Sequence, residues 1–499
     1  MENLMVAIHG IFTPTCLMLI LIGTAVGIIF GAMPGMSATL AVAVFMTIVY
    51  SLDSVNAISL LMALYIGGIS GGLISAILIN IPGTPSSVAT TFDGAPLARN
   101  GNAAKALGVG ITFSAIATIL STIALLFVAP TLAKVAIKFG PYEYFAVTSC
   151  SLLLVAGLAG KNLAKGIISA LFGLAAGCIG CAPVDSAFRF TFGSSALRAG
   201  INAVPVMVGL FAIPEILRYA KKDIKFETKE PPKFKGLGFS VKEFVGQTWN
   251  TIRSFVIGLF VGVLPGIGGG TSNLLSYAAA KSMAKGEKKE KFGTGIIDGV
   301  VASETANNAS IGGAMIPLLS LGIPGDGVTA ILMGAFVMKG YTLGPLFFEK
   351  YPDVSYIIYI GMIVSTIFMF ILQYTCLKGF VKLMSTPLRM LLPAVMFICM
   401  IGAFCATNTN LSLWALLVFG FLGFILSEFG APLAPMIIGF VIGPTSELYL
   451  RRGMQFSDGS FLPFITDSKL AMVLYIIAAL FLLYKIFGGL LKKKKAASN

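Results

Sequence analysis

The chain has 499 residues, of which 57% are hydrophobic and 11% are charged, and its formal net charge is +14. Many of its apolar runs reach the length of about 20 residues that crosses a bilayer as a helix, which excludes an ordinary soluble domain. These runs do not alternate as β-barrel strands would, so the composition predicts an all-α polytopic membrane protein. The basic residues gather in loops and in the tail at 491–495, where they indicate cytoplasmic segments rather than nucleic-acid binding.

The elements follow one another in two halves. The first half, 1–219, contains apolar helices predicted at 10–30, 37–52, 54–80, 104–130, 141–159, 163–181 and 201–219. A basic stretch with a Pro-Pro pair then predicts a cytoplasmic linker at 220–250. The second half, 251–499, contains apolar segments near 252–266, 270–284, 296–322, 327–346, 354–384, 388–405, 411–427, 431–447 and 469–490. Some are too short or too rich in glycine and proline to cross alone, so we expect roughly 10 to 14 crossings plus re-entrant pieces.

Two motifs recur in order across the halves. Gly31-x-x-Pro34-Gly35 matches Gly262-x-x-Pro265-Gly266 at an offset of 231 residues. A Gly-Gly pair followed by Ile-Pro-Gly occurs first at 71–83 and again at 312–325, at offsets of 241 and 242. An inserted loop at 281–291 accounts for the larger offset, so the chain is predicted to contain two homologous repeats. That loop carries five lysines and its counterpart near 50–55 carries none, which favours repeats that are inverted in the membrane.

Four segments place proline, glycine and polar residues at membrane depth, namely 31–39, 80–94, 262–277 and 303–329. Proline removes an N–H donor and glycine permits unusual backbone, so these segments predict broken helices whose ends carry partial charges. Paired broken helices in two repeats are typical of the binding site of a secondary transporter, although a single Pro-Gly is more simply a kink. The candidate substrate-binding residues are Pro34, Gly35, Asn80, Pro82, Gly83, Thr84, Ser86, Ser87, Pro265, Gly266, Gly268, Thr271, Asn273, Asn307, Asn308, Pro324 and Gly325.

Acidic side chains in apolar surroundings are the candidates for cation coupling. They are Glu304, Asp326 and Asp93, because a carboxylate within a membrane is costly and is retained for a function. Asp93 is the weakest of the three, since its segment runs on toward Arg99. Arg189 could pair with Asp185 or touch an anion, and a loop ion pair is the simpler interpretation.

The sequence gives little support for an enzymatic function. The sequence contains no phosphate-binding loop, and its single histidine, His9, excludes a multi-histidine transition-metal site. Gly68-x-Ser70-Gly71 matches the serine motif of rhomboid-type proteases, but no histidine that could act as the base lies nearby. Cys178 and Cys181 stand among small residues that suit helix packing rather than redox chemistry. We therefore expect no catalytic residues and no cofactor, with a sodium ion near Glu304 and Asp326 as the one metal considered.

The paired segments resemble a known family. "GAMPGMSA", "INIPGTPSS", "GVLPGIGGG", "ASETANNAS" and "LGIPGDG" together are similar to the large membrane subunit of the tripartite tricarboxylate transporters, the TctA type, over residues 10–460. The resemblance implies a secondary uptake system with a small four-helix membrane subunit and a periplasmic solute-binding protein as partners. It also implies import of citrate or related carboxylates, driven by sodium or protons, across a bacterial or archaeal inner membrane. The family pattern carries over to Pro34-Gly35, Pro82-Gly83, Pro265-Gly266, Glu304, Asn307-Asn308 and Pro324-Gly325.

The sequence thus predicts the large subunit of a cation-coupled carboxylate transporter that works by alternating access, with elevator-like movement suggested by fold-level analogy. A passive channel for organic anions and a membrane scaffold that does not transport are the two alternatives. The carried carboxylate, the coupling ion and the oligomeric state, a homo-oligomer included, are not determined by the sequence.

Overall fold

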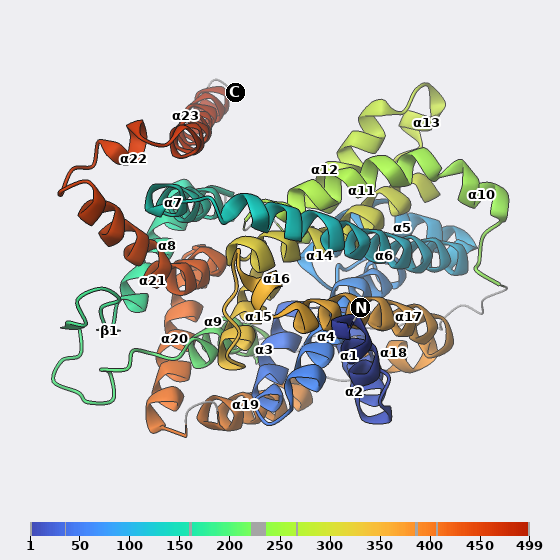
Figure 1. The fold of residues 1–499 in the computed structure, drawn as a ribbon. Coiled ribbons are helices and arrows are strands. Elements are labelled where there is room, and N and C mark those ends of the chain that lie inside the picture. The colour runs from blue at the N-terminus through green and yellow to red at the C-terminus, as the bar shows by residue number, and fades with distance from the viewer. Residues whose placement is uncertain are drawn as a thin grey trace.

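The structure, a computed structural model, describes residues 2–34, 36–158, 162–220, 236–265, 268–384, 388–405 and 408–497, and it is 79% helical with almost no sheet (Figure 1). The elements up to residue 220 are α1 (Glu2–Ile11), α2 (Pro14–Ala32), α3 (Ala38–Val49), α4 (Ser54–Leu78), η1 (Pro85–Ser87), α5 (Val88–Leu97), η2 (Ala98–Asn102), α6 (Ala103–Ala136), α7 (Pro141–Leu158), α8 (Leu163–Gly177), β1 (Gly180–Cys181), β2 (Phe188–Arg189) and α9 (Ala203–Ala220). The later elements are α10 (Val241–Gly246), α11 (Thr248–Val263), α12 (Gly268–Met283), α13 (Glu287–Glu290), α14 (Ile297–Leu321), α15 (Gly327–Met338), α16 (Phe347–Lys350), α17 (Pro352–Thr375), α18 (Leu377–Met384), α19 (Leu388–Cys405), α20 (Asn410–Glu428), α21 (Leu433–Phe456), α22 (Pro463–Thr466) and α23 (Lys469–Ala497).

The prediction of an all-α polytopic membrane protein is confirmed. Within the described residues, six helical stretches are long and apolar enough to span a membrane: Pro14–Ala32, Ser54–Leu78, Pro85–Ala136, Pro352–Thr375, Asn410–Glu428 and Leu433–Phe456. Helices α3 and α15, which each follow a Pro-Gly break, are apolar but only 12 residues long. The total of 10 to 14 crossings and the re-entrant pieces stay predictions.

The predicted helices differ from the observed ones mainly at their ends. The helix expected at 10–30 is divided at Phe12 and Thr13, where the Thr13 hydroxyl caps α2 by accepting from the Cys16 amide at 3.3 Å. The segment expected at 354–384 is divided at Cys376 into α17 and α18. Much of the predicted linker, 221–235, lies outside the described residues, and its later part contains α10 and the start of α11.

Glycines allow matching helix pairs to approach closely in the two halves. A Cβ atom on Gly31 of α2 would lie 2.2 Å from the carbonyl oxygen of Gly68 in α4, and one on Gly262 of α11 would lie 2.7 Å from that of Ser310 in α14. Small residues at a helix contact permit this approach in membrane proteins. Gly68 and Ser310 are separated by 242 residues, the offset of the Ile-Pro-Gly motifs. This shared packing supports the prediction of two related halves, while their inversion in the membrane stays a prediction.

The helices sort into two groups by their mutual packing. One group comprises α2, α4, α6, α11, α14 and α17, and the other comprises α7, α8, α9, α19, α20 and α21. The short helices α3 and α15 contact each other and both contact α9 of the second group. In Figure 1, α7, α8, α9, α20 and α21 lie in the left part of the molecule and α19 lies along the bottom, while α10 lies at the far right and α13 at the upper right. Helices α4 and α14 are buried along almost their whole length and form the centre of the first group.

Candidate functional site

Each of the four predicted breaks separates two helices in the structure. The breaks lie between α2 and α3, α4 and η1, α11 and α12, and α14 and α15, so each of them presents a new helix N-terminus. Gly35 and Gly266 lie outside the described residues. Gly83 and Gly325 are held by close packing, because a Cβ atom would lie 2.1 Å from the Gly31 carbonyl oxygen in the first case and 2.7 Å from the Gly262 carbonyl oxygen in the second.

The helix N-termini meet across the two halves. Helix α12 packs against η1, and α3 packs against α15. The side-chain amide of Asn273 in α12 donates a hydrogen bond to the carbonyl oxygen of Ser86 in η1. A Cβ atom on Gly268, at the start of α12, would lie 3.1 Å from the Asp326 Cβ atom. The breaks of the first half therefore face those of the second, as a site at a repeat interface requires.

Unpaired polar atoms are concentrated where α12 faces η1. Asn307 is fully buried, and neither atom of its side-chain amide makes a well-formed hydrogen bond among the described residues, although the amide lies near the Glu304 carboxylate one turn earlier. The Asn273 Oδ1 atom and the Ser276 hydroxyl likewise have no hydrogen-bond partner there. Beside them the Thr84 and Ser86 hydroxyls are buried and lie 2.9 Å apart. Buried polar groups are nearly always paired, so this cluster has the donors and acceptors of a ligand site.

Asp326 lies at the break between α14 and α15, the predicted counterpart of the break before η1. Its Oδ1 atom accepts from the amide and hydroxyl of Thr329, both at 2.7 Å, and so caps the N-terminus of α15. Its Oδ2 atom accepts from the hydroxyl of Tyr65 in α4 at 2.7 Å. Tyr65 and Asn307 are 242 residues apart, as are Thr84 and Asp326. The polar groups are therefore paired on one side of the molecule and unpaired on the other.

Glu304 lies at the centre of a buried network of hydroxyl and amide groups. Its carboxylate accepts hydrogen bonds from the Thr90 hydroxyl, from the Ser114 hydroxyl at 3.0 Å and from the Asn308 amide at 3.3 Å. The Asn308 amide oxygen accepts in turn from the Ser70 hydroxyl at 2.6 Å. Among the described residues no basic side chain forms an ion pair with Glu304, whose exposure is zero. The donors fit a carboxylate, yet its charge has no protein counter-ion.

The remaining candidates are distributed around this centre. Asp93 anchors the loop that leads into α14, since its Oδ1 atom accepts from the amides of Gly293, Gly295 and Ile296 at 2.9, 2.9 and 3.1 Å. Its Oδ2 atom accepts from the Tyr277 hydroxyl at 2.9 Å, so Asp93 does not join the Glu304 network. Ser87 is buried and caps η1, Thr271 is partly buried, and Asn80 is exposed at the end of α4. Pro34 and Pro324 are buried and Pro82 and Pro265 are partly buried within the breaks.

Sequence reasoning found Asn308 but missed three of the side chains that complete these networks. They are Ser114 of α6, which bonds to Glu304, Tyr65 of α4, which bonds to Asp326, and Ser70 of α4, which bonds to Asn308. One signal for Ser114 was available, because α6 carries hydroxyl residues at 112, 114, 118, 121 and 122 within an otherwise apolar span. Tyr65 and Ser70 carry no comparable signal, since single tyrosines and serines are ordinary in such helices.

Arg189 pairs with a different acid from the one considered. Its guanidinium binds Glu447 of α21 through two hydrogen bonds, one of them 2.9 Å long, while Asp185 pairs with Arg451 at 2.8 Å. This pair borders a cavity of about 550 Å³ between α8, α21 and the C-terminal part of α15. Arg189 is therefore engaged by a carboxylate, which leaves the neutral groups near Asn307 as the better candidates for an anion.

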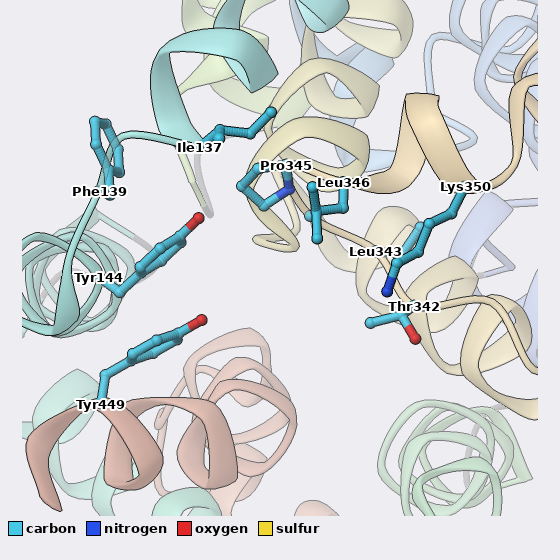
Figure 2. Close-up of a pocket in the computed structure, with 10 residues that line it drawn as sticks. Ile137, Phe139, Tyr144, Thr342, Leu343, Pro345, Leu346, Lys350 and Tyr449 are labelled. Atoms are coloured by element: carbon cyan, nitrogen blue, oxygen red, sulfur yellow. The ribbon is translucent and has the colours of Figure 1, made fainter. Parts of the chain in front are cut away.

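A further cavity lies away from the breaks. It has a volume of about 290 Å³ and is bordered by the α6–α7 turn, the loop before α16, and α21. Figure 2 shows the stacked rings of Tyr144 and Tyr449, 4.4 Å apart, with both hydroxyls directed the same way. None of the predicted site residues lines it.

Residues 17–438 match the sequence profile of the tripartite tricarboxylate transporter TctA family. The chain belongs to this family. The resemblance deduced from the broken-helix motifs is thereby confirmed, and membership places this TctA-family chain in a family of transporters. Tripartite systems of this kind include a small membrane subunit and a periplasmic binding protein.

Two relatives of this TctA-family chain come from Agrobacterium vitis. One is described as an uncharacterized 52.8 kDa protein in the TAR-I ttuC' 3'region, and it is 35% identical over 95% of this chain and 94% of its own length. The other is described as an uncharacterized protein in the TAR-II ttuC' 3'region, and it is 37% identical over 44% of this chain and 89% of its own length. No solved structure matches.

Proposed function

We propose that this chain is the translocating subunit of a cation-coupled tripartite transporter that imports small carboxylates by alternating access. Family membership supports the tripartite system, and the cluster around Asn307 supports a carboxylate site within it. The small membrane subunit and the periplasmic binding protein would be its partners, and the bacterial or archaeal inner membrane its location.

The carboxylate would bind where η1 and α12 begin. Helix N-termini carry unpaired N–H groups and a partial positive charge, so they attract anions without a fixed positive charge. Thr84, Ser86, Asn273 and Asn307 would supply neutral donors beside them. The observation that carries this proposal is the fully buried Asn307 amide, which makes no well-formed hydrogen bond among the described residues and lies close to Gly269: a Cβ atom on that glycine would be 2.7 Å from the Asn307 Oδ1 atom.

Glu304 would bind the coupling cation or proton. An ionised carboxylate buried without a counter-ion is strongly unfavourable, so a sodium ion or a proton that neutralises it is stabilised there. Glu304 and Asn307 lie one turn apart on the same helix, α14. Neutralising the Glu304 carboxylate removes a negative charge close to Asn307, so an anion binds more favourably beside Asn307. Asp326 would instead position the start of α15, because both of its oxygens are already hydrogen-bonded.

Transport would move one group of helices against the other. Helices α3 and α15 contact both groups, which makes them the elements through which relative movement reaches the breaks. An elevator-like displacement fits this division into two packed groups, and we propose it as the form of alternating access.

The direct test is uptake of labelled citrate by proteoliposomes that contain the chain with its two partners, with and without a sodium or proton gradient. We expect accumulation above the external concentration, which a passive channel cannot give. The double substitution Ser86→Ala with Asn307→Ala should reduce uptake at least about tenfold, a loss of about 1.4 kcal/mol of binding or transition-state stabilisation.

The matched control is Ser282→Ala, which removes an exposed hydroxyl from the other end of α12. It should transport as the wild type does. If the double variant retained full uptake and full ion dependence, the assignment of this site would be wrong.

A further inference from the structure

Another polar cavity lies between α11 and the C-terminal end of α12. Its volume is about 280 Å³, which is several times the roughly 30 Å³ that one water occupies in the liquid. The lining side chains that matter chemically are Trp249, Asn250, Arg253, Lys285, Lys288 and Asp298. None of them belongs to the site described above.

The cavity carries an excess of positive charge. Lys288 is compensated, since its ammonium group lies 2.7 Å from the Asp298 carboxylate. Arg253 donates one hydrogen bond to the Asn250 side-chain oxygen, but it forms no ion pair among the described residues, and its Nε–H is buried without a partner. Lys285 likewise forms no ion pair there. A guanidinium with free donors is well suited to a phosphate group, which it can bind through two parallel hydrogen bonds.

The surroundings of the cavity have the character of a membrane interface. Val241 and Val245 of α10 and Trp249 of α11 are exposed and follow one another at intervals of four residues. Tryptophan is enriched at the level of lipid headgroups, and short amphipathic segments lie in the same plane.

Beyond Trp249, an apolar stripe continues along α11. Ile252, Val256 and Phe260 are all exposed, again at intervals of four residues. One face of α11 thus carries a stripe of exposed apolar side chains, and Arg253 lies on this face in the second turn, where it lines the basic cavity. This is the arrangement that a phospholipid needs, with a place for its phosphate and a surface for its acyl chains.

We propose that this cavity binds the phosphodiester headgroup of an anionic phospholipid, with Arg253 and Lys285 holding the phosphate and the acyl chains lying along Ile252, Val256 and Phe260. The lipid would bridge α11 and the C-terminal end of α12, the two helices that flank the Pro265 break. It would thereby stabilise the placement of α12, which carries Asn273 at its other end.

The test compares the full-length protein with its variants in detergent titrated with dioleoylphosphatidylglycerol or dioleoylphosphatidylcholine. Bound lipid is counted by native mass spectrometry, and thermal unfolding is followed in parallel. We expect phosphatidylglycerol, but not phosphatidylcholine, to bind and raise the unfolding temperature. Arg253→Gln should weaken that binding about tenfold, as expected for the loss of charge-assisted hydrogen bonds worth about 1.4 kcal/mol.

Lys285→Gln provides a second variant if Arg253→Gln does not fold, because Lys285 has no ion pair to lose among the described residues. Lys289→Gln is the matched control, since it removes one exposed lysine from the same loop but does not line the cavity. It should change the affinity less than twofold. Equal losses from Lys289→Gln and Lys285→Gln would indicate diffuse surface attraction and would overturn the proposal.

Inorganic phosphate and glycerol phosphate distinguish a lipid from a free phosphate compound. If either of them raised the unfolding temperature as much as phosphatidylglycerol and displaced it, the site would belong to a soluble phosphate compound and the lipid proposal would fail. The readout is binding rather than transport, so its outcome is independent of the carboxylate site.

Discussion

Tyr65 donates its hydroxyl to the Asp326 carboxylate at 2.7 Å, and this bond joins a buried helix of the first half to a broken helix of the second. Under the predicted two-repeat alignment, the counterpart of Tyr65 in the second half is Asn307, which makes no well-formed side-chain hydrogen bond among the described residues. If the halves are repeats, they use the same place on α4 and α14 differently. One of them holds the N-terminus of α15, and the other leaves free groups beside the N-terminus of α12.

Tyr65→Phe removes only that hydroxyl. We expect the free energy of unfolding to fall by about 1.5–3 kcal/mol, the usual contribution of a hydrogen bond to a charged group. Thermal unfolding of the purified protein measures this. The matched control is Tyr356→Phe on α17, whose side chain is only partly buried and whose hydroxyl has no hydrogen-bond partner within the described part of the chain. A Tyr65→Phe protein as stable as the control would mean that the bond to Asp326 contributes nothing.

Asn307→Ala and Asn308→Ala should separate binding from stability. Asn307 has no well-formed hydrogen bond to lose among the described residues, so its replacement should leave the unfolding temperature nearly unchanged or raised while uptake falls at least about tenfold. Asn308 bonds to Ser70, Ser114 and Glu304, so its replacement should destabilise the protein by about 2 kcal/mol or more. Uptake assays and thermal unfolding of both variants give the comparison. A large loss of stability from Asn307→Ala would contradict a ligand-binding role.

Glu304→Gln keeps the shape of the side chain and removes its charge. We expect gradient-driven accumulation to fall by about tenfold to a hundredfold, because the coupling ion loses its carboxylate partner. The residual uptake should no longer depend on the sodium or proton gradient. Glu349→Gln, on the exposed part of α16, is the control. Accumulation by Glu304→Gln that still rose with the gradient would show that coupling occurs elsewhere.

The close packing of α11 against α14 at Gly258 can be tested by a substitution that adds one methyl group. A Cβ atom on Gly258 would lie 2.3 Å from the Ala306 carbonyl oxygen, so Gly258→Ala forces the helices apart and should cost about 1–3 kcal/mol. Gly110 of α6 is the control, because its nearest neighbours are side-chain atoms 3.6 Å away. Gly110→Ala should be neutral or slightly stabilising, as alanine favours a helix over glycine by up to about 1 kcal/mol. Equal unfolding temperatures for the two variants would refute the close contact.

Glu243 gives α10 a dependence on pH. The ion pair with Lys105 and the hydrogen bonds from Ser240 lower the pKa of Glu243 from 4.5 to about 2. Its pKa is lower in the folded state, so its stabilising contribution is complete above pH 4.5 and is lost as the pH falls toward 2. Hydrogen exchange in α10, corrected for the intrinsic rate, should therefore quicken at low pH. Glu243→Gln should show the fast exchange already at about pH 6, and a pH-independent rate in the wild type would contradict this origin.

The positions of the helices could largely be predicted from the sequence. Apolar runs, prolines and glycines act over a few residues, so α3, α4, α14 and α19 begin and end within two or three residues of the expected limits. The paired motifs also indicated both halves and all four breaks, and the family they resemble is the one to which the chain belongs. The small interruptions at Thr13 and Cys376 were missed, because the hydrophobicity of the chain hardly changes there.

Only the tertiary structure decided which hydrogen-bond partners each acidic residue has. Asp93, Glu304 and Asp326 look alike in sequence, each being an acid in an apolar segment. Asp93 accepts amides from a loop 200 residues further along, and Glu304 accepts a hydroxyl from Ser114, 190 residues earlier. A hydrogen bond is formed only at short range, and which groups come within that range depends on how distant helices pack. The sequence by itself determined where the helices break, while the fold decided which polar groups near those breaks are paired and which lack a partner among the described residues.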